Sequence, residues 1–145
     1  MAPFLIDDHL LVRVLAGVAP TTVRRARRRG QLWTTGLWYY RAARALRSPT
    51  ITGALTGQLA GLPAVARTQA VTGIARLPDD IGLQSLRELV PLMSELSITH
   101  RLNLLALEAL GAATHLGADV IVAAENDGPA FRHAVLAEGL GYTAI

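Results

Sequence analysis

The 145-residue chain is predicted to form an α/β domain, a three-layer α/β/α sandwich around a parallel sheet. Short apolar segments alternate with segments of helical periodicity, the order that produces parallel strands joined by right-handed crossovers. The segment "ADVIVAAE" is apolar almost without interruption, which is typical of a strand buried on both faces. The length fits a single domain, 1–145, and no repeat, low-complexity tract or linker divides it.

The first half of the chain is expected to contribute two strands and several helices. "PFLID" predicts a strand, and "DHLLVRVLAG" predicts the helix that follows it and ends at Gly17. A second helix is expected to be capped by Thr21 or Thr22, to carry "VRRARRRG" and to end at Gly30. "QLWTTG" predicts a second strand, and "LWYYRAARALRS" a helix that ends before Pro49. "ITGALTGQLAG" and "PAVARTQAVTGIARL" predict two short helices.

The second half is expected to be helical until a late strand. "PDDIGLQSLRELVPLMSEL" has helical spacing with a bend at Pro91, and "RLNLLALEALGAATHLG" is apolar all round, as in a buried helix. "ADVIVAAE" predicts a strand, and "NDGPAFRHAVLAEGLG" predicts the last helix, with Pro129 in its first turn. "YTAI" predicts a final edge strand.

Composition excludes several classes of protein. The chain has no cysteine, which excludes disulfides, thiolate metal sites and cysteine nucleophiles. No apolar run is long enough to span a bilayer, and the N-terminus lacks the basic region of a signal peptide. We therefore expect a cytoplasmic protein without a membrane partner.

The basic charge gathers in one run. All 14 basic residues are arginine, which we attribute to a GC-rich genome, and the net charge is +3. Five arginines in six residues exceed that net charge, so the rest of the chain is mildly acidic. Such a run is most often a solvated helical face, and its functional interpretation is salt-sensitive contact with nucleic-acid phosphates. The candidate nucleic-acid-binding residues are Arg24, Arg25, Arg27, Arg28 and Arg29.

Aromatic residues follow the basic run. Trp33, Trp38, Tyr39 and Tyr40 invite a base-stacking interpretation. Three consecutive aromatic residues on a helix cannot all face inward, so one is expected to be exposed. Core packing is the preferred interpretation for Trp33 and Tyr40.

Acidic residues follow two predicted strands. Asp7 and Asp8 come after "PFLI", and Glu125 and Asp127 come after "ADVIVAA". Because parallel strands end at one edge of a sheet, these carboxylates are expected to meet there and hold Mg²⁺ or Mn²⁺, which would activate water against a phosphodiester. The alternatives are helix capping by Asp7 and Asp8, and a solvated helical turn for the other two.

The pattern resembles a PIN domain, the fold of many bacterial toxin ribonucleases. "FLIDDHLLVRVL" resembles the family's opening strand, "LGADVIVAAEND" its closing acidic stretch and "EGLGYTAI" its last strand. "LWTTGLWYYRAARAL" lies where the family has a strand and a helix that carries a Glu. The resemblance implies that Asp7 and Glu125 are catalytic. It implies a metal site among Asp7, Asp8, Glu125, Asp127 and Glu108.

The chain departs from the family at two acidic positions. Arg41 occupies the second, and no carboxylate lies between Gln31 and Pro78. The third falls near Ala106, close to Glu108. We hypothesise that Arg41 pairs with Asp7 or Glu125 and replaces the cation, since arginine binds carboxylates in bidentate fashion and stays charged. Glu108 is then a partner of Arg41 or a displaced metal ligand.

Two functional hypotheses remain. In the first, a PIN-like domain with a degenerate acidic pocket binds RNA or acts as a weak Mg²⁺- or Mn²⁺-dependent ribonuclease. In the second, a non-catalytic module binds a second copy or a partner protein, as the dimers and toxin–antitoxin pairs of the resembled family imply. The departures favour a non-enzyme or a much weakened enzyme.

Overall fold

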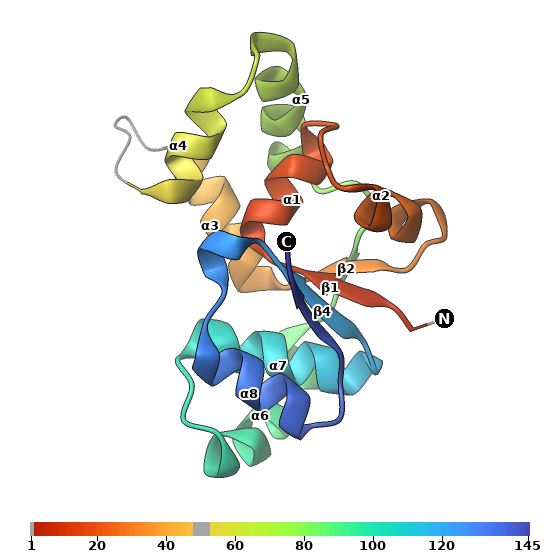
Figure 1. Ribbon diagram of the computed structural model, residues 1–145, viewed down its shortest axis with the longest axis vertical. Helices are drawn as coiled ribbons and strands as arrows, with labels where there is room; N and C mark the ends of the chain where they lie inside the picture. The colour runs from red at the N-terminus through yellow and green to blue at the C-terminus, as the bar shows by residue number, and fades with distance from the viewer. Residues whose placement is uncertain (1, 48–52) are drawn as a thin grey trace.

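The computed structural model describes residues 2–47 and 53–145. Its five strands form one all-parallel sheet in the order β3-β2-β1-β4-β5, and helices cover both faces (Figure 1). This confirms the predicted three-layer α/β/α sandwich, and it confirms that "YTAI" forms an edge strand. The strands are β1 (Phe4–Ile6), β2 (Leu32–Thr34), β3 (Gly82–Leu83), β4 (Asp119–Val122) and β5 (Tyr142–Ala144).

The helices follow the predicted order closely. The described residues form α1 (Asp8–Leu15), α2 (Thr21–Arg28), α3 (Gly36–Leu46), α4 (Ala54–Gly61), α5 (Ala64–Ala75), α6 (Leu86–Thr99), α7 (Leu104–Leu116), the 3₁₀ turn η1 (Ala124–Asn126) and α8 (Pro129–Ala137). The predicted stop at Pro49 lies outside the described residues. No helix in the two described ranges is both long enough and apolar enough to cross a membrane.

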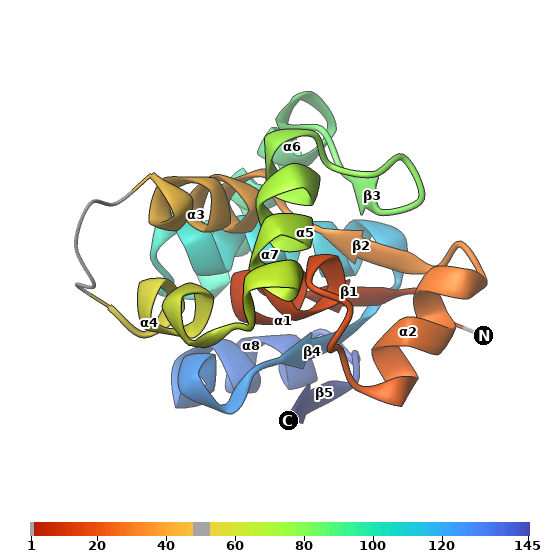
Figure 2. The same cartoon turned by 90° about the horizontal axis from the view of Figure 1, so that it is seen from above.

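Alternation along the strands divides the core in two. Leu5 pairs in register with Val120, and both side chains enter one core; Ile6 pairs with Ile121, and both enter the other. Helices α1, α2, α4 and α5 cover the core that contains Ile6, and α6, α7 and α8 cover the opposite face (Figures 1 and 2). Helix α3 lies between them and contributes to both. The register also brings the carboxyl ends of β1 and β4 side by side.

The structure corrects the prediction between residues 78 and 85. The expected long helix begins only at Leu86, capped by Ser85, and the residues before it contain the two-residue strand β3. Gly82 in this strand packs against the indole of Trp33, where a Cβ atom would lie 2.3 Å from the ring. A strand of this length carries no periodic signal, so helical spacing extended the predicted helix over it.

The structure also corrects the prediction for Tyr40. Its side chain is 59% exposed, whereas Trp38 is buried against the second core and Trp33 is partly buried there. Trp38 and Ala42 are the buried positions of α3, so Tyr40, which lies between them, faces outward. One exposed aromatic residue was expected among Trp38, Tyr39 and Tyr40, and the structure shows that Tyr40 is exposed.

Candidate functional site

Asp7 joins the ends of β1 and β4. It is fully buried and caps α1, because its Oδ1 accepts a hydrogen bond from the Leu10 backbone N–H at 2.9 Å. Its Oδ2 accepts from the Ala123 backbone N–H at 2.9 Å and from the Asn126 side-chain amide at 2.8 Å. The capping interpretation is therefore confirmed, and the same carboxylate also lies at the shared edge of the two strands.

Asp8 forms the second half of this arrangement. It too is fully buried, and its Oδ1 accepts from the His9 backbone N–H at 2.9 Å and from the Asn126 amide at 2.7 Å. Its Oδ2 lies 3.3 Å from Arg41 Nε in an ion pair that lacks hydrogen-bond geometry. Arg41 thus pairs with Asp8, and the hypothesised partners Asp7 and Glu125 were wrong.

Asn126 is the residue that sequence reasoning missed. Its single amide nitrogen donates to one oxygen of Asp7 and to one oxygen of Asp8. One side chain therefore compensates both buried carboxylates through its two N–H groups. The available signal was an amide residue inside "AENDG", flanked by acids at the end of a predicted strand.

Glu125 and Asp127 do not join Asp7 and Asp8. Glu125 is exposed and forms an ion pair with Arg13 at 3.3 Å, while Asp127 pairs with Arg132 and accepts from the Tyr142 hydroxyl at 3.0 Å. The reason is the 3₁₀ turn η1, in which successive side chains point about 120° apart. That turn directs Asn126 inward and its two acidic neighbours outward. The expected four-carboxylate cluster was therefore wrong.

Tyr142 is a partner of Asp127 at the surface. Desolvation by burial, with a smaller contribution from the hydrogen bond to Asp127, raises its pKa to about 12. The Arg132 guanidinium lies 5.4 Å from the centre of the Tyr142 ring. Asp127 is thus held at the surface between an arginine and a tyrosine.

Glu108 has a different structural role from the acids at the strand edge. It is fully buried on α7, and its Oε1 accepts from the Leu37 backbone N–H at 2.8 Å. Its Oε2 lies near Gly36 and has no hydrogen-bond partner. A carboxylate at this place stabilises the positive N-terminal end of α3. Glu108 therefore fixes the helix that carries Arg41, and it forms no ion pair with Arg41.

The residues at the strand edge do not fit the Mg²⁺ or Mn²⁺ ion implied by the family resemblance. Such ions take about six oxygen ligands in near-octahedral geometry. Both Asp7 oxygens instead accept from N–H groups, and the free oxygen of Asp8 faces a guanidinium. Within the described ranges, no three His, Asp or Glu residues form a group suited to a metal ion.

Burial changes the acidity of Asp7. Desolvation raises its pKa above the ordinary 3.8, and the charge of Asp8 acts in the same direction; hydrogen bonds from Leu10, Asn126 and Ala123 oppose the rise. The folded protein therefore favours the protonated carboxyl more than the unfolded chain does.

A cleft of about 170 Å³ lies beside this arrangement. None of the residues that line it is acidic. They are Trp38, Arg41, Asn103, Leu105, Ala106, Val122, Asn126 and Phe131. The position near Ala106, where the resembled family has its third acid, thus contributes a methyl group. The cleft offers amides, aromatic rings and a guanidinium.

The arginines of the basic run on α2 differ in their contacts. Arg27 forms two hydrogen bonds to Asp80, Nε to Oδ2 at 2.7 Å and Nη2 to Oδ1 at 3.0 Å, and these hold the pKa of Asp80 below its usual value. The other four arginines of the run are exposed: Arg24, Arg25, Arg28 and Arg29.

Positive charge extends far beyond that run. Residues 9–78 contain 11 arginines and no Asp or Glu, while the rest of the chain contains 3 arginines and 11 acidic residues. The first segment forms α1 to α5, and the second supplies α6, α7 and α8 on the opposite face of the sheet. The view of one basic run on a mildly acidic domain was therefore too narrow. Residues 9–78 therefore make a basic half of the chain and the remaining residues an acidic half, and the two meet in the ion pairs of Arg13, Arg27 and Arg41.

We expect Asn126→Asp to destabilise the fold by about 2–4 kcal/mol at neutral pH, because it removes two N–H donors and adds a third carboxylate. Urea unfolding at pH 7 measures this change. Asn103→Asp is the matched control: Asn103 caps α7 through its side-chain oxygen, and Asp caps equally well, so stability should change by less than about 0.5 kcal/mol. Equal effects of the two substitutions would contradict the bridging role of Asn126.

The raised pKa of Asp7 predicts a pH dependence with a defined sign. Between 3.8 and the raised value, the folded state binds more protons than the unfolded state, so this carboxyl lowers stability as pH rises. In Asp7→Asn the group no longer titrates. The unfolding free energy of the wild type minus that of the variant should therefore decrease as pH rises from about 4. A difference that stays constant or grows, measured by urea unfolding across pH 4 to 7, would refute the assignment.

Comparison with known proteins shows a fold relationship. No protein-family model matches the chain, and no curated protein matches it. A crystal structure of PAE2754 from Pyrobaculum aerophilum aligns with 99% of this chain and 83% of its own, with a TM-score of 0.51 and 16% sequence identity. At that identity the similarity shows a shared fold.

Proposed function

We propose that this protein is a PIN-like domain that binds single-stranded RNA and does not hydrolyse it with a metal ion. The main support is the segregation of charge along the chain: residues 9–78 contain 11 arginines and no acidic residue, and Arg13, Arg27 and Arg41 among them pair with acids from other segments. Phosphate contacts by such arginines supply sequence-independent, salt-dependent affinity. The acidic half repels phosphate and so orients the molecule on a nucleic-acid strand.

Contacts at the strand edge support the proposed absence of hydrolysis. Asn126 and Arg41 compensate the charge of Asp7 and Asp8, which a divalent cation would otherwise neutralise. Glu125, which the family resemblance makes catalytic, pairs with Arg13 at the surface. These contacts support binding rather than metal-dependent cleavage.

A protein-interaction module is the second candidate, and α6 favours it. Leu86 and Val90 are neighbours one turn apart on this helix and are 46% and 54% exposed, and Ile98 near its end is 86% exposed. Exposed apolar residues of this kind can pack against a partner helix or a second copy. Helix α6 lies in the acidic half of the chain, outside the segment whose arginines are proposed to contact RNA.

We expect fluorescence anisotropy to show that a labelled 12-nucleotide oligouridine binds with an affinity that falls steeply with salt. The double variant Arg25→Gln/Arg28→Gln should weaken binding and reduce the slope of log affinity against log salt by about 0.7 for each lost phosphate contact. Arg87→Gln/Arg101→Gln removes two exposed arginines of the acidic half and should leave binding unchanged.

The same oligonucleotide should remain intact in Mn²⁺ and Mg²⁺. Cleavage that depends on Asp7 would overturn the non-catalytic assignment. If the wild type binds no oligonucleotide but sediments as a dimer that Ile98→Asp dissociates, the interaction module replaces the RNA-binding proposal.

A further inference from the structure

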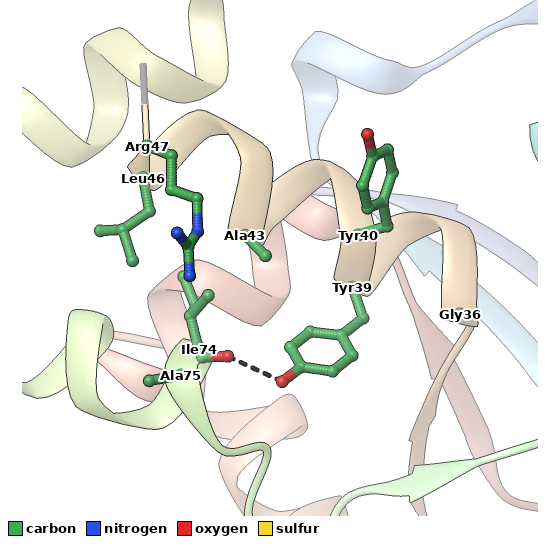
Figure 3. A pocket seen from close by; sticks show the side chains of 8 residues that line it. All are labelled: Gly36, Tyr39, Tyr40, Ala43, Leu46, Arg47, Ile74 and Ala75. Atoms are coloured by element: carbon green, nitrogen blue, oxygen red, sulfur yellow. Dashed lines mark hydrogen bonds between the residues drawn. The ribbon is translucent and has the colours of Figure 1, made fainter. Parts of the chain in front are cut away.

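A groove of about 390 Å³ lies between α3 and α5, apart from the strand edge. Ala43, Leu46 and Ile74 give it an apolar surface, and the Tyr39 hydroxyl donates to the Ile74 backbone oxygen at 2.7 Å (Figure 3). That bond satisfies the polar atom of Tyr39 and leaves its ring as part of the groove wall. The volume is in the range of sites that hold small organic groups.

Tyr40 and Arg47 are among the residues that line this groove, and Arg44 lies one turn after Tyr40 on the same helix. Tyr40 projects outward from α3, and Arg47 extends toward the α5 side (Figure 3). Arg44 and Arg47 follow Tyr40 by four and seven residues, so the backbone positions of the three residues lie on one side of the helix. Tyr40, Arg44 and Arg47 are all exposed.

The charges on this side of α3 are uncompensated. Within residues 2–47 and 53–145, neither Arg44 nor Arg47 forms an ion pair, whereas Arg41 on the same helix pairs with Asp8. Residues 9–78, which form both walls of the groove, contain no acidic residue. An occupant of this site must therefore present an apolar or aromatic face together with negative charge.

We propose that this groove holds an unpaired base of single-stranded RNA, stacked on Tyr40, with the flanking phosphates on Arg44 and Arg47. The inference rests on the proposed function and assigns a binding subsite to it. A nucleobase supplies the planar face that an exposed tyrosine stacks on, and a strand carries phosphates on both sides of it. The apolar groove beside the ring shelters the base from water, as a flat exposed surface cannot.

Stacking on Tyr40 is tested with an oligouridine that carries one 2-aminopurine, whose fluorescence falls when the base stacks. Tyr40→Ala should weaken binding about 5- to 150-fold, the equivalent of one base–aromatic stack, and should abolish the quenching. Tyr40→Phe keeps the ring and should retain both the affinity and the quenching. Because Tyr40 is exposed, thermal unfolding should remain close to that of the wild type in both variants.

The phosphate contacts are tested by salt titration. Arg44→Gln and Arg47→Gln should each reduce the salt slope by about 0.7, and Arg67→Gln, an exposed arginine of α5 outside the groove lining, should not. If the wild type binds but Tyr40→Ala binds equally well with full quenching, the subsite is wrong and RNA binding itself stands. If the wild type does not bind the oligonucleotide, both the subsite and the proposed function fail.

Discussion

The buried Asp7 carboxylate is the interaction on which the rest of this strand edge depends. It accepts hydrogen bonds from the first turn of α1, from the backbone after β4 and from Asn126. These contacts fix where α1 begins and how the chain leaves β4. The 3₁₀ turn after β4 places Asn126 between Asp7 and Asp8, while Glu125 and Asp127 pair with Arg13 and Arg132 outside this arrangement. The buried Asp7 carboxylate thus helps to set the direction in which Asn126 faces.

The same arrangement explains how two adjacent buried acids are tolerated. A buried carboxylate without partners is costly, and breaking a buried pair leaves an uncompensated charge. Five N–H groups and one guanidinium supply the compensation here, and Glu108 holds the helix that delivers the guanidinium. Because these groups are donors and a cation, they compete with a metal ion for the same oxygens. The two acids are therefore compensated within the protein by its own donors and one guanidinium.

The sequence predicted the features that periodicity and composition encode. Short apolar segments predict β1 and β4, and the apolar sequence of α7 predicts its burial. The sequence also predicts that Arg41 pairs with an acid at the strand ends, but the expected partners were Asp7 or Glu125 and the structure pairs it with Asp8. Asn126 faces inward and Glu125 outward because successive side chains of a 3₁₀ turn point about 120° apart. Three residues are too few to show this as a periodic pattern in the sequence. The exposure of Tyr40 depends on which side of α3 meets the sheet. The segregation of charge can be counted directly from residues 9–78, but which helices these residues form is known only from the fold.

Titration calorimetry with Mn²⁺ tests whether Arg41 occupies the place of a cation beside Asp8. Mn²⁺ should not bind the folded wild type, should bind Arg41→Glu, and should no longer bind Arg41→Glu/Asp8→Asn. Circular dichroism on each variant confirms that it is folded. Mn²⁺ binding to the wild type that disappears in Asp8→Asn would refute this role of Arg41, because it would show that the acids hold a metal ion with Arg41 in place.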